Sequence, residues 1–236
     1  MSQAAAPPAL RLRGLRFAWP GGAFALEVDG FELTAGEALF LAGPSGSGKS
    51  TLLSLICGIV RPQAGEAQLF GEDLATLGQA RRDRLRAERI GVIFQMFNLV
   101  PYLSGLENVL LPLRFAPGRR AACADPRAEA LALTEALGLP RATVERGAAG
   151  ALSVGQQQRI AVARAMIGGP PLIVADEPTS ALDAAAQADF MDLLFDRARA
   201  AGAALLMVSH DRRLADRFDR TEELTDIART RRADAA

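Results

Sequence analysis

A glycine-rich segment that begins at residue 43 constrains the fold of this chain more than any other part of the sequence. It lies between a short apolar run, residues 38–42, and a helical pattern, residues 49–59, so it connects a buried strand to a helix. The segment reads Gly43-Pro44-Ser45-Gly46-Ser47-Gly48-Lys49-Ser50-Thr51 and fits the pattern G-x-x-x-x-G-K-[ST]. Its glycines allow backbone N–H groups to converge on a phosphate, and the helix start adds partial positive charge. The segment therefore predicts an α/β protein that binds a phosphate-bearing ligand.

Lys49 is the only lysine among the 27 lysine and arginine residues of the chain. Lysine carries a compact charge on a flexible stem, whereas arginine is a planar fork with five donors. A tight loop of N–H groups around a phosphate has room for the first side chain and not for the second. We therefore assign Lys49 to the β- and γ-phosphates of a nucleotide, and the hydroxyl of Ser50 to Mg²⁺.

A second motif follows the apolar run 172–175, where Asp176 and Glu177 end a predicted buried strand. In an open α/β sheet, ligands bind beyond the carboxyl ends of the strands. There Asp176 would hold Mg²⁺ through water, and Glu177 would polarise the attacking water. The alternative is a strand that merely ends in solvated acidic residues, and the phosphate loop elsewhere in the chain argues against it.

A third motif precedes a predicted helix at residues 156–166. Ser153, Val154, Gly155 and Gln156 form a Ser-x-Gly-Gln turn, which presents a hydroxyl and backbone N–H groups to an anion. Taken alone, this turn is better explained by a helix N-cap that binds no ligand.

Composition excludes several classes of protein. The net charge is zero and the pI is about 6.6, which argues against binding to nucleic acid through a broad basic face. Arginines in 81–89 alternate with acids, as on a solvated helix face. Cys57 and Cys123 lack metal-site spacing. No run approaches the roughly 20 apolar residues that span a bilayer, and residues 1–8 lack the pattern of a secretory signal. We expect a cytoplasmic protein that reaches a membrane only through a partner.

The pattern of elements predicts a parallel sheet with crossover helices, interrupted by a helical insertion. A hairpin is expected at 10–28, and frayed ends at 1–8 and 229–236. The predicted strands are 38–42, 66–70, 90–94, 171–175 and 203–208, and the predicted helices are 49–59, 80–89, 106–113, 125–137, 156–166 and 184–200.

Together these motifs resemble the ATP-binding subunit of ABC transporters over about residues 10–228, in the order that the family shows. The resemblance implies a P-loop NTPase of ABC-ATPase fold: a RecA-like parallel-sheet core (about 10–95 and 167–228), an N-terminal antiparallel β subdomain and an α-helical subdomain (about 96–166). It also implies a role for each motif residue. These are Trp19, which stacks on adenine; Gly43 to Thr51, the Walker A loop; Gln95, the Q-loop glutamine that touches Mg²⁺ and the membrane partner; Ser153, Gly155 and Gln156, the signature motif; Asp176 and Glu177, the Walker B aspartate and catalytic glutamate; Ser180 to Asp183, the D-loop; and His210, the switch histidine.

The family works as a head-to-tail dimer, so the resemblance implies two ATP molecules with Mg²⁺ held between two copies of this chain. Each nucleotide would be bound by Lys49, Ser50 and Asp176 of one copy and by Ser153 and Gly155 of the other. One departure is Val154, since the family usually has glycine there. Because Ser153 and Gly155 are intact, we expect the site to work, with closure of the dimer tuned by Val154, whose β-branched side chain takes a positive φ only with strain. The alternative is a degenerate, weak site.

Residues 94–104, with Leu106-Glu107-Asn108-Val109 and Leu111-Pro112-Leu113, resemble exporters related to lipoprotein release and macrolide efflux. Such subunits transmit mechanical force to a permease with four spans, from the inner face of the membrane. We expect the permease to dock on an apolar patch formed by Met96, Phe97, Leu99 and Tyr102, although these residues would also suit packing within the helical lobe.

Other functions on the same motifs remain open. The motifs do not separate transport from regulation of cell-wall hydrolases through a membrane partner, as in the cell-division ABC pair. An ABC ATPase acting on ribosomes or DNA would need a second cassette or a coiled-coil insertion. A P-loop kinase would lack the signature motif, the D-loop and His210.

Overall fold

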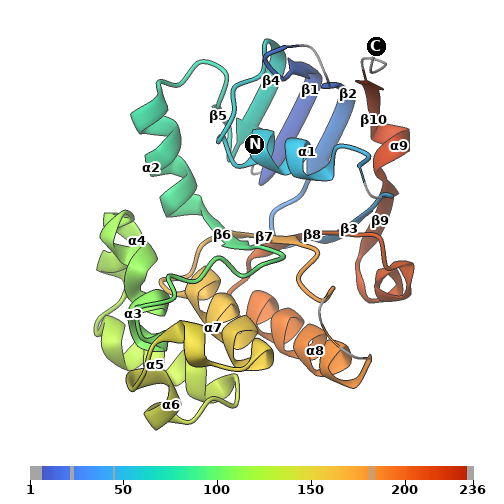
Figure 1. The fold of residues 1–236 in the computed structure, drawn as a ribbon. Helices are drawn as coiled ribbons and strands as arrows, with labels where there is room; N and C mark the ends of the chain where they lie inside the picture. Colours follow the sequence, from blue (N-terminus) through green and yellow to red (C-terminus); the bar gives the residue numbers. More distant parts are fainter. Residues whose placement is uncertain (1–6, 22–23, 45, 181, 183, 233–236) are drawn as a thin grey trace, which may run out of the picture. The chain divides into compact units, whose positions relative to one another are not determined.

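The computed structural model describes residues 7–21, 24–44, 46–180, 182 and 184–232, and the chain forms two compact units. The first unit contains the residues up to Arg86 and those from Ala204 onward, and the second contains Ala87–Ala203. Figure 1 shows the elements of both units.

An antiparallel sheet in the first unit has the strand order β10-β2-β1-β4-β5. The strands are β1 (Leu10–Ala18), β2 (Phe24–Leu33), β4 (Ala64–Leu69), β5 (Glu72–Asp73) and β10 (Ala228–Arg232). Leu12 and Leu15 are buried on one face, and a register shift between Arg13 and Arg16 accounts for their odd spacing. The predicted hairpin at 10–28 is confirmed by the β1–β2 pairing.

The predicted fraying from residue 229 is wrong for the part of that segment that the structure describes. Strand β10 pairs with β2 from Ala228 opposite Val28 to Arg232 opposite Phe24. Residues 229–231 are polar and exposed, which suits an edge strand, because such side chains can stay in solvent while the backbone completes the ladder.

A parallel ladder in the first unit carries the phosphate loop. Strand β3 (Ala38–Ala42) pairs with β8 (Ala204–Ser209) on one side and with β9 (Arg220–Glu223) on the other. Helix α1 (Lys49–Ile56) follows β3, and its start lies against the antiparallel sheet, since Gly48 faces side chains of β2 and β10 (Figure 1). The remaining helical elements that begin in this unit are α2 (Gln79–Arg89), η3 (Arg212–Arg217) and α9 (Leu224–Ile227).

The second unit is mostly helical and contains one parallel pair of strands, β6 (Ile90–Ile93) and β7 (Leu172–Asp176). Its helices are α3 (Gly105–Leu110), η1 (Leu111–Arg114), α4 (Pro117–Ala122), α5 (Pro126–Ala136), α6 (Arg141–Glu145), η2 (Ala149–Ala151), α7 (Val154–Met166) and α8 (Ala184–Ala200). The unit therefore includes residues 87–95 and 167–203, which the sequence pattern grouped with the parallel core. The reason is local packing, because α7 lies directly on β6 and beside α8.

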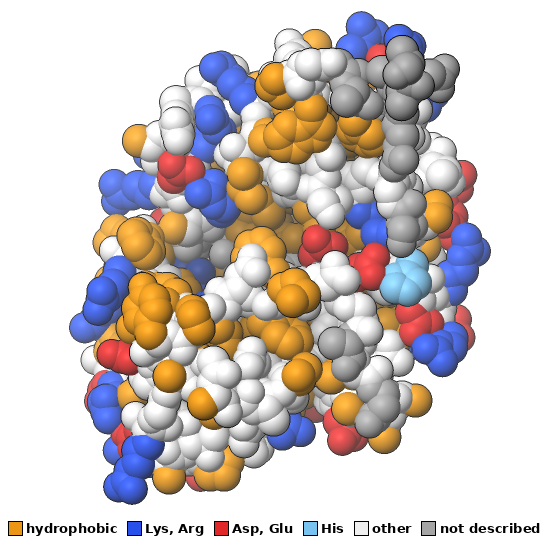
Figure 2. All heavy atoms as spheres, viewed as in Figure 1, with side chains coloured by type: hydrophobic (Ala, Val, Ile, Leu, Met, Phe, Trp, Pro, Cys, Tyr) orange, Lys and Arg blue, Asp and Glu red, His pale blue; other side chains and the backbone are white. Residues whose placement is uncertain are grey.

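Within the described residues, none of the helices has both the length and the apolar character that crossing a bilayer requires. On the face drawn in Figure 2, arginine and acidic side chains are interspersed, as expected for a chain of zero net charge.

Gly91 of β6 generates a test of the packing between this strand and α7. A Cβ at position 91 would lie 2.1 Å from the carbonyl oxygen of Ala165, which is rigid helix backbone. We therefore expect Gly91→Ala to lower the free energy of unfolding by about 2–3 kcal/mol and the thermal midpoint by several degrees. Gly30→Ala in β2 is the matched control, since a Cβ there meets nothing within 4 Å. Equal midpoints for the two variants in thermal unfolding would contradict this packing.

Candidate functional site

The phosphate loop takes a backbone that its glycines permit. Gly46 has φ +76° and Gly48 has φ +101°, both in the left-handed region. Gly48 is the N-cap of α1 and provides no side-chain acceptor, so the first N–H groups of the helix are not capped by it. A helix start of this kind, with its partial positive charge, favours an anion.

The side chain of Lys49 contacts the backbone of the loop that precedes it. Its side chain is only 7% exposed, and its Nζ donates to the carbonyl oxygens of Gly43 at 2.7 Å and Pro44 at 3.0 Å. The ammonium group is therefore anchored to the loop backbone. Two further observations indicate a cradle: the buried Oγ of Ser47 has no hydrogen-bond partner among the described residues, and a Cβ on Gly43 would lie 3.0 Å from it. A phosphate oxygen is a suitable acceptor for an unpartnered hydroxyl at this position.

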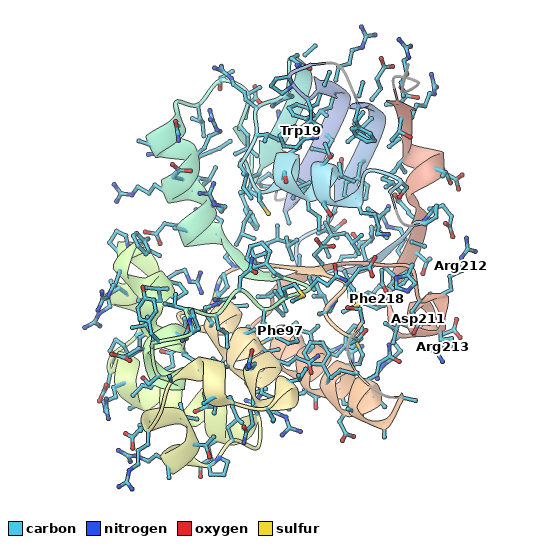
Figure 3. The ribbon with its side chains drawn as sticks, in the orientation of Figure 1. Trp19, Phe97, Asp211, Arg212, Arg213 and Phe218 are labelled. Atoms are coloured by element: carbon cyan, nitrogen blue, oxygen red, sulfur yellow. The ribbon has the colours of Figure 1, made fainter. Side chains whose placement is uncertain are left out.

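Trp19 is connected to the phosphate loop through the first turn of α1. Its indole Nε1 donates to Oγ1 of Thr51 at 3.2 Å, and its ring meets Phe17 edge to face with centroids 5.1 Å apart (Figure 3). Trp19 remains 39% exposed, so part of its ring is available for stacking. Ser50, the predicted Mg²⁺ ligand, has its side chain on the exposed side of the same turn.

His210 follows the last residue of β8 and is exposed. The phosphate loop begins beside this strand end, since the N–H of Gly43 donates to the carbonyl of Ser209 at 3.3 Å. On the other side of His210, the Asp211 N–H donates to Oγ of Ser209 at 3.1 Å, and Arg213 donates to both oxygens of the Asp211 carboxylate at 2.8 and 2.7 Å (Figure 3). No sequence motif predicted these hydrogen bonds beside His210, although Asp211 at the start of a helical turn is a recognisable N-cap.

The two acids at the end of β7 differ in their backbone. Asp176 ends the strand, whereas Glu177 has φ +44° and is only 8% exposed. A left-handed conformation is unfavourable for glutamate and persists only where the surroundings hold it. Here the side-chain amide of Gln158 on α7 donates to the carbonyl of Pro178 at 2.8 Å, and Gln187 on α8 donates to Oγ1 of Thr179 at 3.1 Å. Neither glutamine lies in a sequence pattern that predicts such a contact.

Gln95 lies just beyond β6 and is exposed, as a residue that reaches a ligand should be. The apolar patch predicted after it is only partly present. Met96 and Tyr102 are each 80% exposed and Leu99 is half-buried, but Phe97 is 6% exposed and belongs to the core (Figure 3). The prediction that Phe97 contributes to a docking surface is therefore wrong. Phe97 also has a positive φ, +58°.

The signature turn is the start of α7. Ser153 is the N-cap, its Oγ accepts the N–H of Gln156 at 3.3 Å, and Oε1 of Gln156 accepts the N–H of Ser153 at 2.9 Å. Val154 is the first helical residue, so it has ordinary right-handed backbone and the expected strain is absent. A Cβ added to Gly155 would meet nothing within 4 Å, so the fold of this chain does not itself require glycine there.

The structure groups the candidate residues into two sets. The first unit holds the phosphate loop, Trp19 and His210, and the second holds Gln95, Asp176, Glu177 and the signature turn. Within the second unit, α7 contacts the segments that follow β6 and β7. Three of the predicted site and D-loop residues, Ser45, Ala181 and Asp183, lie outside the described residues.

Comparisons with known proteins agree with this arrangement. Residues 26–180 match the family model described as ABC transporter. The chain is 43% identical over 229 residues to the lipoprotein-releasing system ATP-binding protein LolD of Anaeromyxobacter dehalogenans, covering 96% of this chain and 94% of that one. It is 40% identical over 223 residues to the pyoverdine export ATP-binding/permease protein PvdT of Pseudomonas syringae, covering 93% of this chain and 33% of that one. Among solved structures, the ATP-binding cassette MJ0796 in a dimeric post-hydrolysis state with ADP and Pi superposes with a TM-score of 0.80 at 33% identity, covering 96% of this chain and all of the other.

Lys49 offers a test of the phosphate cradle. We expect Lys49→Ala to weaken ATP binding at least tenfold, because a charge-assisted hydrogen bond contributes about 1.5–3 kcal/mol. Lys49→Arg should also weaken it, because the planar fork does not fit under the loop. Fluorescence of Trp19, the only tryptophan, reports binding directly. Ser54→Ala on the same helix is the control, and its affinity should be unchanged. Wild-type affinity in Lys49→Arg would contradict the close fit.

Proposed function

This chain belongs to the ABC transporter family as an ATP-binding and ATP-hydrolysing subunit, and we propose that it dimerises head to tail around two MgATP to drive a membrane permease in export. The observation that carries the proposal is the exposed signature turn at the start of α7. Gly155 has no side chain although this chain leaves room for a Cβ at that position, and glycine is a poor helix former. A group from outside the chain that approaches the backbone of Gly155 closely explains this choice.

The γ-phosphate of an ATP held by another copy is that group in our proposal. The hydroxyl of Ser153, the start of α7 and the amide of Gln156 would form its half of the composite site. Asp183 would act at the same interface. Because each nucleotide then contacts two copies, ATP favours the closed dimer by its differential affinity, and moving such an equilibrium from 1:99 to 99:1 takes about 5.5 kcal/mol.

Within each copy, we assign the phosphates to the loop 43–51, with Lys49 on the β- and γ-phosphates and Trp19 on adenine. The oxygen donors of Ser50, Gln95 and Asp176 fit Mg²⁺, which prefers such ligands and retains several waters. When bound, Mg²⁺ supplies charge that neutralises the phosphate oxygens. Glu177 would orient the attacking water, while His210 would contact the γ-phosphate and report its loss.

Glu177→Gln tests this mechanism. The variant should bind ATP like the wild type, because its shape is retained, and hydrolyse it roughly 10²–10⁴-fold more slowly, because the carboxylate that orients water is gone. With release of the γ-phosphate blocked, it should accumulate as a dimer in MgATP, as measured by light scattering after size exclusion. A variant that stays monomeric at saturating MgATP would contradict the composite site.

The proposal also includes a surface on which the membrane permease docks. Met96 and Tyr102 are large, exposed side chains close to Gln95 in the sequence, as a surface that relays contact with a permease to the nucleotide would require. Two relatives support export by their names, a lipoprotein-releasing system and a pyoverdine export protein that includes a permease. We infer a force-transmitting exporter on the inner face of the cell membrane. Regulation of cell-wall hydrolases through a similar partner is the alternative.

Charged substitutions at the docking surface, Met96 and Tyr102, test whether the permease binds there. Met96→Asp and Tyr102→Asp should abolish copurification with the membrane permease from the native host and leave ATP binding intact, because both side chains are exposed. Phe115→Asp is the matched control, since Phe115 is 65% exposed in the same unit but lies away from Gln95 in the sequence. If all three variants copurified equally well, the proposed docking surface would be wrong. Phe97→Asp is unsuitable because it would place a charge in the core.

A further inference from the structure

Two loops of the second unit contain backbone that their own residues disfavour. Among the described residues, four non-glycine residues have positive φ: Phe70, Phe97, Asn98 and Glu177. Glu177 is itself a group to which the proposed function assigns chemistry, and Phe97 and Asn98 follow a second such group, Gln95, two and three positions later. Each such conformation costs on the order of 1–3 kcal/mol and must be held by its surroundings.

Arg164 on α7 holds the first loop. Its guanidinium donates to the carbonyl oxygens of Phe97 and, at 2.7 Å, of Asn98, which are the two left-handed residues. The bend is tight, since the N–H of Phe97 donates to Phe94 at 2.9 Å and that of Asn98 to Met96 at 2.6 Å. A forked donor that reaches two adjacent carbonyls fixes their peptide planes, which a single ammonium group would not do.

Burying the charged guanidinium of Arg164 lowers the stability of the fold. The side chain is 9% exposed, its burial lowers the pKa of the guanidinium, and no carboxylate pairs with it among the described residues. A buried charge without an ionic partner destabilises a protein relative to a well-packed apolar side chain. Its placement is therefore explained by the bend that it holds and not by a gain in stability.

Gln158 holds the second loop from the same helix. Its side chain is 2% exposed, and its amide donates to the carbonyl of Pro178, the residue after Glu177. The loop then closes on itself, because the N–H of Ser180 donates to the carbonyl of Glu177 at 3.2 Å. Helix α7 thus carries three groups on one rigid element: the signature turn at its start, Gln158 in its middle and Arg164 near its end.

We propose that Gln158 and Arg164 are positioning residues for ATP hydrolysis, through which α7 fixes the Glu177 loop and the Gln95 loop to the signature turn. Because α7 is one helix, a displacement of its start by nucleotide shared with a second copy moves both anchors together. A contact at the exposed Met96 would reach α7 through Arg164 in the opposite direction. This role presupposes the proposed function, which names Gln95 and Glu177 as the groups that must be positioned.

Arg164→Met and Gln158→Met remove the donors and nearly preserve side-chain volume. We expect each to lower kcat for ATP roughly ten- to a hundredfold, since small misplacements of reacting groups have effects of that size. ATP affinity, read from Trp19 fluorescence, should stay within about threefold of wild type, because neither residue is assigned to the nucleotide. Hydrogen exchange should accelerate at 95–98 in Arg164→Met and at 177–180 in Gln158→Met, each without the other.

Arg119→Met is the matched control. Arg119 is also a buried arginine of the second unit, 5% exposed, and it donates to the carbonyls of Ala87, Ile90, Ala165 and Ile167, none of which belongs to a nucleotide motif. Burial lowers its pKa to about 10. Its loss should change the thermal midpoint at least as much as the loss of Arg164 does, while kcat stays within about twofold.

The outcomes separate the two proposals. In the first outcome, wild type hydrolyses ATP, and Arg164→Met and Gln158→Met hydrolyse it as fast as wild type and Arg119→Met do. The positioning role is then wrong and the proposed function stands. If Arg119→Met loses as much kcat as Arg164→Met, both arginines are merely structural and the role is again wrong. If Glu177→Gln hydrolyses ATP at the wild-type rate, the proposed function fails independently of α7.

Discussion

Hydrogen bonds from buried side chains to loop carbonyls are the interaction on which the candidate site depends. The residues that carry chemistry follow the ends of buried strands, and there the backbone must turn sharply. Lys49 anchors to the carbonyls of its own loop, whereas the bend after Gln95 and the loop after Glu177 are anchored from α7. Without these donors, the left-handed residues beside the site would relax to commoner conformations.

The need to anchor loop carbonyls also explains where lysine and arginine are used in this chain. An ammonium group fits under a tight loop and still carries charge toward a phosphate, so the only lysine lies there. Arginine reaches several carbonyls from a distance, and two buried arginines, Arg119 and Arg164, do this in the second unit. Both remain cations although burial lowers the pKa of each. Other arginines pair with nearby acids, as exposed Arg213 does with Asp211 beside His210.

The α7 helix gives the second unit its internal order. It packs on β6 closely enough that Gly91 has no room for a Cβ, and its first residue lies in the turn that resembles the signature motif. Ordinary helical backbone at Val154 removes the objection that a β-branched residue would strain that turn. The departure from the family's usual glycine therefore has no cost within this chain.

Much of this protein could be predicted from local patterns. The phosphate loop between β3 and α1, the bounds of α8 and the apolar runs of β7 and β8 depend on periodicity and on residues within one segment, which sequence displays directly. Strand β10 was missed because its polar residues form a strand only when β2 offers an edge. The burial of Phe97 agrees with the alternative of packing within the helical lobe, and the local pattern could not decide between packing and docking because this segment has no regular apolar period.

By itself, the sequence determined the family, the order of the motifs and the chemical identity of each candidate residue, because these are properties of residue types at fixed spacing. Only the tertiary structure decided which backbone conformations those residues adopt and what holds them. Gln158 and Arg164 are 20 and 66 positions away in sequence from the carbonyls of Pro178 and Asn98 that they bind. Such pairings arise when a helix packs against strands remote in the chain, so no local pattern could reveal them.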